Sequence, residues 1–267
     1  MLLHRPQPHA FKEKEPVDCS TPKDVFEHSP EELVDIALSE LQAAGIQLIE
    51  WRALVNRRMD VPVVVRYYSY VVPDEDLPRA SRILSDIGLP LLPHSELLSK
   101  AQGDIHTKAT HHRLDRSFQC VPYFALYPAS FVSFKPEELY TSAPVHHRSS
   151  MSTTRVLVPR PSAVYGWLFR TMLLYPKYCS VRTILNSTLS ELVDYHLLQV
   201  QEGFVDPDES PELWEELDMP KRTIDALDVI SQWTRNDEWR DGEEWFGDAL
   251  AAIVSNEGNM DYLPCGS

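Results

Sequence analysis

The sequence predicts an α+β protein: a small mixed sheet with flanking helices, followed by a C-terminal part made of helices. Segments with helical and β-strand patterns alternate over residues 29–88, and residues 61–72 carry a marked β pattern. Beyond residue 159, apolar residues recur at the three- and four-residue spacing of helices. We divide the chain into a flexible N-terminal arm (1–28), an α/β-like core (29–158), a helical part (159–255) and a frayed tail (256–267).

The core is expected to begin with an amphipathic helix at Ser29. A serine hydroxyl accepts hydrogen bonds from the free amides of a first helical turn, and Glu32 completes a capping box. Pro30 suits the first helical position, and Gly45 suits the left-handed residue that ends a helix.

Two strands are predicted next, at residues 47–51 and 61–72, with a short helix at 52–59 between them. The valines and tyrosines of the second strand favour a central place in the sheet, and Pro73 ends it because proline cannot donate to a ladder. Asp74 is expected to cap a second amphipathic helix that stops at Gly88.

The later segments are assigned from the same patterns. Residues 102–115 and 141–154 are polar and are interpreted as surface segments, the second of them at the domain boundary. The remaining expected elements are a helix at 93–100, a strand pair within 119–134, a strand at 155–158, a buried helix at 161–174, a helix capped by Ser187 that runs to Gly203, and helices at 221–236 and 241–255.

The formal net charge is -15, and most of the imbalance lies after residue 200, where 18 acidic and 4 basic residues occur. The rest of the chain is nearly neutral, so no basic face is available for nucleic acid. The acidic helices are interpreted as a solvated face or, alternatively, as a docking face for a basic protein partner.

No apolar run approaches the ~20 residues of a membrane-spanning helix, and the first ten residues lack the apolar segment of a secretory signal. We therefore expect no membrane association and a cytoplasmic location, the nucleus not excluded. The four cysteines show no CxxC spacing, which fits neither a disulfide framework nor a zinc site.

The order helix, strand, short helix, strand, helix, then a later strand leading into a proline-started helix (VLVPRPSAVYGWLFRTML), resembles the minimal nucleotidyltransferase-like fold of the polymerase-β superfamily. The resemblance spans roughly residues 31–201, and the chain is also similar to uncharacterised fungal proteins of this type. In that family a glycine-containing turn follows the first strand. An Asp-x-Asp pair on the next strand and a later carboxylate hold two metal ions.

Those chemical motifs are missing here. The turn after the first strand reads Trp51-Arg52-Ala53-Leu54, without glycine, and the second strand reads VRYYSY where the acidic pair is expected. Magnesium needs hard oxygen ligands, which these residues do not supply. The sequence therefore predicts a catalytically degenerate nucleotidyltransferase-like protein that acts as a binding or scaffold module, with no catalytic residue, no metal and no cofactor.

The resemblance implies a cleft where the missing acidic residues would lie. Its candidate lining residues are aromatic or basic: Trp51, Arg52, Arg66, Tyr68 and Tyr70. They offer a stacking surface for a ring or a peptide. Ordinary sheet packing is the competing interpretation. Because side chains alternate along a strand, Tyr68 and Tyr70 share one face and Tyr67 takes the other.

Two other functions are considered as alternatives. The first is an active nucleotidyltransferase with a magnesium site rebuilt from Asp74, Asp76 or Asp104 with His106. The second is a structural interaction protein that uses its acidic helices.

Histidines give the remaining candidates for chemistry. His106, His111 and His112 with Asp115 are the densest set of possible metal ligands; we interpret them, like His146 and His147, as surface-loop residues without a ligand role. His196 is expected to be a hydrogen-bonded core histidine.

Overall fold

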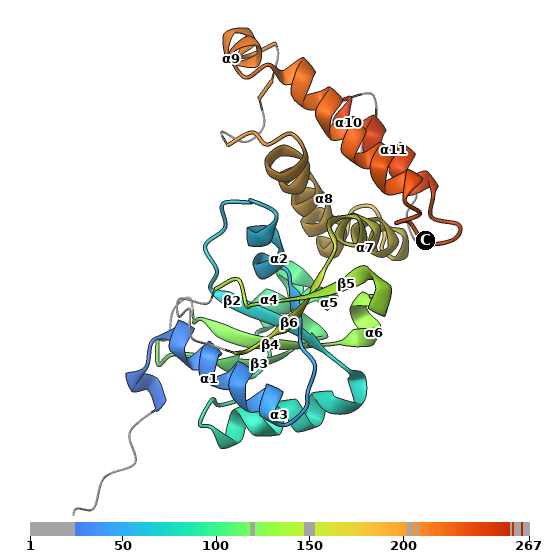
Figure 1. The fold of residues 1–267 in the computed structure, drawn as a ribbon. Coiled ribbons are helices and arrows are strands. Elements are labelled where there is room, and N and C mark those ends of the chain that lie inside the picture. The colour runs from blue at the N-terminus through green and yellow to red at the C-terminus, as the bar shows by residue number, and fades with distance from the viewer. Residues whose placement is uncertain are drawn as a thin grey trace, which may run out of the picture.

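The computed structural model describes residues 25–117, 121–146, 153–201, 205–206, 208–256, 258 and 263. A six-stranded mixed sheet in the order β3-β4-β2-β1-β6-β5 carries helices on both faces and is followed by further helices, which confirms the predicted α+β class (Figure 1). Most of the predicted arm (1–28) and tail (256–267) lies outside the described residues. The strands are β1 (Ile49–Trp51), β2 (Tyr67–Val72), β3 (Thr110–Arg113), β4 (Tyr123–Pro128), β5 (Leu139–Ser142) and β6 (Val156–Pro159).

The centre of the sheet is formed by β1 and β2, which run antiparallel with Glu50 opposite Tyr70. β6 lies parallel to β1, and β4 lies parallel to β2. β3 and β5 form the two edges, each antiparallel to its neighbour. The predicted central place of the second strand is therefore confirmed.

One face of the sheet is covered by α1 (Pro30–Ala43) and α3 (Leu77–Asp86), which lie side by side beneath it in Figure 1. The capping box of α1 is present: the Glu32 amide donates to Ser29 Oγ at 3.3 Å, and the Ser29 amide donates to Glu32 Oε2 at 2.8 Å. The apolar side of α1 belongs to the same hydrophobic cluster as Tyr70 and Phe124 of the sheet, so the expected amphipathic helix covers this face.

The opposite face carries more helices, and its hydrophobic cluster continues into the C-terminal part. α7 and α8 pack on this face, and residues of α10 and α11 belong to the same cluster. The predicted core and the predicted helical part thus share one apolar core.

The remaining helices have the following bounds: α2 (Ala53–Arg58), α4 (Glu96–Gln102), α5 (Asp104–Thr107), α6 (Ala129–Val132), α7 (Pro161–Leu174), α8 (Ser180–Leu192), a π-helical turn (Val193–Leu197), α9 (Pro211–Glu216), α10 (Met219–Arg235) and α11 (Trp245–Val254), with 3-10 turns at Val25–Glu27, Asp74–Asp76 and Pro136–Glu138.

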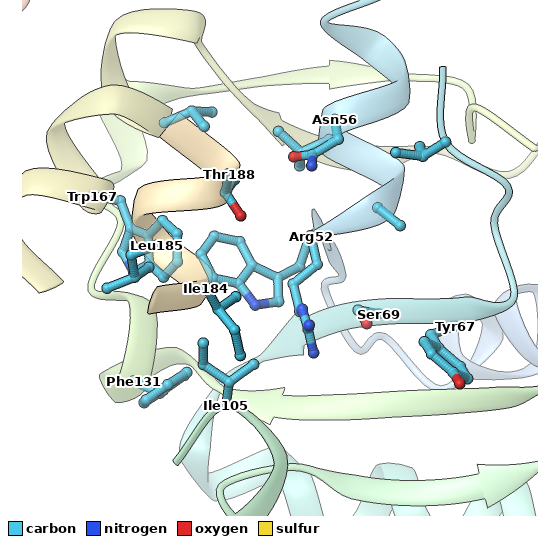
Figure 2. Close-up of a pocket in the computed structure, with 15 residues that line it drawn as sticks. Arg52, Asn56, Tyr67, Ser69, Ile105, Phe131, Trp167, Ile184, Leu185 and Thr188 are labelled. Carbon is cyan, nitrogen blue, oxygen red and sulfur yellow. The ribbon is translucent and has the colours of Figure 1, made fainter. Parts of the chain in front are cut away.

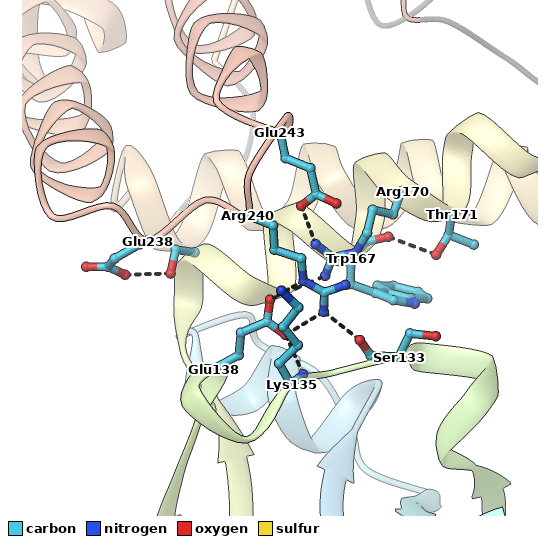
Figure 3. Close-up of polar contacts among 10 residues, drawn as sticks. Ser133, Lys135, Glu138, Trp167, Arg170, Thr171, Glu238, Arg240 and Glu243 are labelled. Atoms are coloured by element: carbon cyan, nitrogen blue, oxygen red, sulfur yellow. Dashed lines mark hydrogen bonds and ion pairs between the residues drawn. The ribbon is translucent and has the colours of Figure 1, made fainter.

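Charged side chains tie the segment between α10 and α11 to α7 and to the turn before β5 (Figure 3). Arg240 donates to both carboxylate oxygens of Glu138, at 2.6 and 2.7 Å, and to the carbonyl of Ser133. Arg170 of α7 pairs with Glu243 at 2.6 Å. Part of the acidic charge of the C-terminal region therefore serves docking within the chain.

Several predicted elements were wrong in extent. Only Tyr67–Val72 of residues 61–72 is a strand, and the described part of 119–134, residues 121–134, holds one strand followed by α6 instead of a strand pair. The helix assigned to start at Ser187 starts at Ser180, where Cys179 Sγ accepts from the Arg182 amide at 3.5 Å. Ser187 is thus an interior residue of α8.

Asp74 does not cap the helix that follows it. Its Oδ1 accepts from the Ser130 amide at 2.9 Å, in the first turn of α6. The two polar segments also contain regular structure, because residues 102–115 include α5 and β3 and residues 141–154 begin within β5. None of the described helices combines the length and the apolar character needed to cross a membrane.

Candidate functional site

A cavity of about 160 Å³ lies where β1 passes into α2, between the sheet and helices α7 and α8 (Figure 2). Its wall is largely aromatic and aliphatic, with Trp51, Tyr67, Phe131 and Trp167 as its rings. Among the residues that line it, all within the described part of the chain, Arg52 is the charged one and none is acidic. The cavity thus combines apolar walls with one cation.

The β2 side of the cavity is formed by Tyr67 and Ser69, which are two residues apart and so lie on the same face of the strand. In the resembled family an acidic i, i+2 pair would occupy such a face. Here it carries a phenol and a hydroxyl. Neither group is the hard anionic ligand that a magnesium ion requires.

The five residues predicted for the cleft separate in the structure. Trp51 and Arg52 line the cavity. Tyr68 and Tyr70 lie on the opposite face, in the core under α1 and α3, and Tyr68 borders a separate pocket there. Arg66 precedes β2 and is exposed. The predicted alternation of the tyrosines holds, and Tyr67 is the one that faces the cavity.

Arg52 has an unusual backbone at the turn between β1 and α2. Its φ of 52° and ψ of -123° lie in a region that glycine adopts readily and that a Cβ atom disfavours. The turn therefore keeps a glycine-like conformation although the sequence has no glycine there. Strain of this kind costs on the order of 1–3 kcal/mol and occurs most often at functional sites.

The Arg52 side chain extends toward Ile105 and β2 (Figure 2). It donates to the Tyr127 hydroxyl at 3.2 Å and to Gln102 Oε1 at 3.3 Å, both neutral acceptors. Across the described residues, no carboxylate forms an ion pair with it. A half-buried guanidinium without a counter-ion is a natural anion-binding group.

Further hydrogen-bonding groups of the cavity residues have no partner. The indole nitrogens of Trp51 and Trp167 and the Ser69 hydroxyl are buried and make no hydrogen bond within the described part of the protein. The two indole rings pack edge to face, with their centroids 4.2 Å apart. An indole N–H only donates, so each of these tryptophans lacks an acceptor. Buried groups of this kind call for a bound water or a ligand.

The histidines interpreted as surface residues are buried, which corrects that interpretation. His111 and His112 stand on β3 with 3% and 0% exposure, and His106 on α5 has 4%. His112 Nδ1 lies 2.8 Å from the Leu89 carbonyl, and its Nε2 lies 2.9 Å from Ser81 Oγ. Burial lowers the pKa of all three, in His111 to about 3, where the charges of His106, His94 and Arg52 add to the effect.

His146 is also buried instead of exposed. Its Nδ1 lies 3.4 Å from the Tyr70 hydroxyl and its Nε2 lies 3.1 Å from Asp35 Oδ1, so it links the sheet to α1. His147 lies outside the described residues. His196 is half-buried and contacts the Tyr165 hydroxyl through Nδ1 at 3.2 Å, so the predicted hydrogen bond is present.

The carboxylates considered for a rebuilt magnesium site have separate partners. Asp74 accepts from Ser130, Asp76 pairs with Arg79 at 3.9 Å, and Asp104 accepts from the Tyr175 hydroxyl at 2.8 Å. In the portion of the chain that is described, none of them belongs to a group of three or more potential metal ligands. The geometry gives that alternative no support.

Comparison with known proteins gives no family assignment. No protein-family model matches the chain, and a search of curated proteins finds no significant match.

Tyr67 and Trp167 are two of the cavity residues that the sequence did not indicate, and each was missed for a physical reason. Tyr67 was placed on the second face of its strand, but the pattern could not say which face would be open. Trp167 belongs to a helix that is apolar around most of its circumference, so no stripe indicated the side facing the sheet. The cavity therefore depends on tertiary packing.

Proposed function

We propose that this protein is a non-catalytic binding module on a nucleotidyltransferase-like core, and that its ligand is a small anion carrying a ring. The proposal rests on the Arg52 guanidinium, which stands without a carboxylate partner among the described residues and lines the cavity next to two tryptophans that lack hydrogen-bond acceptors. A carboxylate or phosphate group supplies the acceptors, and the aromatic wall receives the ring.

The size of the cavity narrows the ligand class. A cavity of about 150 Å³ holds a benzene molecule, whereas pockets for larger ligands measure roughly 300–1,000 Å³. The 160 Å³ here suits one ring with an anionic group and is small for a nucleoside triphosphate. The size and the lack of lining carboxylates both argue for a binding role over nucleotidyl transfer.

A thermal-shift screen tests the proposal. Benzoate and phenyl phosphate are expected to raise the melting temperature, and the neutral analogue benzyl alcohol is expected to raise it less, because ligands that bind only the folded state stabilise it by mass action. Adenosine triphosphate should give no shift that depends on Mg²⁺ or Mn²⁺. A metal-dependent shift, or specific turnover of the nucleotide, would instead favour an active nucleotidyltransferase.

A second candidate role uses the acidic helices as a contact face for a basic protein. Exposed carboxylates lie along α9 and α10, and Ile224 on α10 is 59% exposed beside them. α9 and part of α10 project away from the sheet (Figure 1). Association with a basic partner through this face should weaken from low to high salt. Binding that does not change with salt would count against this role.

A further inference from the structure

We propose that His94, His106 and His111 bind a zinc ion. One ring nitrogen from each of the three lies within 4.8 Å of the other two. Zinc–nitrogen bonds of about 2.0–2.1 Å in a tetrahedral site place the ligand nitrogens roughly 3.4 Å apart. Rotation of the three side chains, of which His94 is exposed, would bring these nitrogens to that spacing.

Unpartnered nitrogens are the second observation. Both ring nitrogens of His106 and Nε2 of His111 are buried and find no hydrogen-bond partner among the described residues. Leaving a buried polar atom unpaired costs about 1–3 kcal/mol. His112, the neighbouring buried histidine, has contacts at both of its nitrogens. Packing alone therefore does not explain these unpaired nitrogens, whereas a shared metal ion would pair one nitrogen of His106 and one of His111.

The backbone fixes the three segments against one another. The Leu92 amide donates to the His111 carbonyl at 2.8 Å, which holds the segment leading to His94 beside β3. His106 stacks on His111 with ring centroids 4.4 Å apart, and His94 meets both rings edge on. The three rings are thus gathered at one place, and His106 and His111 must tilt out of their stack to direct one nitrogen each at a shared ion.

Three imidazoles leave the fourth position of a tetrahedral zinc open, as in catalytic zinc sites. The Tyr123 ring lies 4.7 Å from His111, and its buried hydroxyl makes no hydrogen bond within the described residues. Arg52 is near enough to act electrostatically on His106 and His111, and its charge opposes a bare cation. An anionic fourth ligand, such as hydroxide or a carboxylate, offsets that repulsion.

The test uses the full-length, tag-free protein, stripped of metal with a chelator and then titrated with Zn²⁺ by calorimetry. Its variants are His94→Ala, which changes an exposed side chain, and His106→Ala. His28→Ala is the control because His28 is exposed and lies outside the cluster. Titration with Co²⁺ adds a spectroscopic readout, since low-coordinate cobalt absorbs visible light.

The wild type and His28→Ala should bind one Zn²⁺ per chain with equal affinity, and His94→Ala should bind at least about 10-fold more weakly. The visible cobalt bands should disappear in His94→Ala. No saturable binding by the wild type, or wild-type affinity in His94→Ala, would overturn the proposal. If His106→Ala fails to fold, the zinc affinity of His94→Ala alone tests the proposal. Loss of zinc binding would not affect the anion test, which depends on Arg52.

Discussion

The Arg52 guanidinium donates to the Tyr127 hydroxyl at 3.2 Å, and that hydroxyl donates in turn to the carbonyl of Ile105 at 2.7 Å. This chain of hydrogen bonds joins the strained turn after β1 to the strand β4 and to the start of the segment that carries His106. These hydrogen bonds position the Arg52 guanidinium at the cavity through neutral partners. The positive charge of Arg52 therefore remains available to a ligand.

The turn at Arg52 leads to the first prediction. Arg52→Gly and Arg52→Ala lose the same side-chain contacts, but only alanine keeps a Cβ at φ 52°. We expect the glycine variant to be more stable than the alanine variant by about 1–2 kcal/mol in urea denaturation. Glycine also makes the unfolded chain more flexible, which favours unfolding. This effect reduces the stability difference between the two variants but does not reverse it. Equal stabilities would show that the turn carries no strain.

A buried ion pair gives the second prediction. Glu50 has no exposed side-chain surface and pairs with Arg58, and its other oxygen accepts from the Val145 amide at 2.8 Å. Arg58→Met removes the partner and leaves a buried carboxylate. We expect this change to lower the free energy of unfolding by about 3–5 kcal/mol at pH 7. The neighbouring Arg57→Met is the control because Arg57 is exposed, and it should cost less than about 0.5 kcal/mol.

The same variant has a predictable response to pH. Burial raises the pKa of Glu50, and Arg58 partly opposes that effect. Without Arg58 the pKa rises further, and an acid with a raised pKa in the folded state loses stability as the pH rises. Arg58→Met should therefore regain stability relative to wild type between pH 7 and pH 5. A deficit that is the same at both pH values would contradict this explanation.

Asp194, in the π-helical turn after α8, gives the third prediction. Burial, with a contribution from Glu191, raises its pKa to about 6. Ionisation then costs more in the folded than in the unfolded protein, so wild-type stability falls as the pH rises from about 4 through 6. Asp194→Asn should be more stable than wild type by about 1 kcal/mol at pH 7, after allowance for solvent screening, and equal to it at pH 4.

The measurement is thermal or urea unfolding of both proteins across this pH range. Asp228→Asn on α10 serves as the control, because Asp228 is exposed. A stability gain in Asp194→Asn that persists at pH 4 would show that the effect does not come from ionisation.

Elements with strong local signals were predictable from the sequence. α1 has a capping box at Ser29, and α7 begins at Pro161 and is apolar along its length; both appear at the predicted positions. β3 and β5, with the sequences THHR and LYTS, lack alternating apolar residues, and they form because β4 and β6 supply paired neighbours. Pairing of that kind is tertiary information.

The site was harder to predict than the fold. Trp51 and Arg52 could be singled out because they lie where the first strand ends, at the place where the resembled family has its turn. The cluster of His94, His106 and His111 could not, because the three residues come from different elements and share no metal-binding spacing. His94 gave no signal of its own, and the polar sequence around His106 and His111 suggested a surface loop.

The most direct test of the binding role is a calorimetric titration of benzoate into the wild type, Arg52→Gln and Arg66→Gln. Arg66 is an exposed arginine outside the cavity and serves as the matched control. The proposal predicts equal binding by wild type and Arg66→Gln. Arg52→Gln should bind at least about 10-fold more weakly, since a charge-assisted hydrogen bond contributes about 1.5–3 kcal/mol. No binding by the wild type, or equal binding by all three proteins, would contradict it.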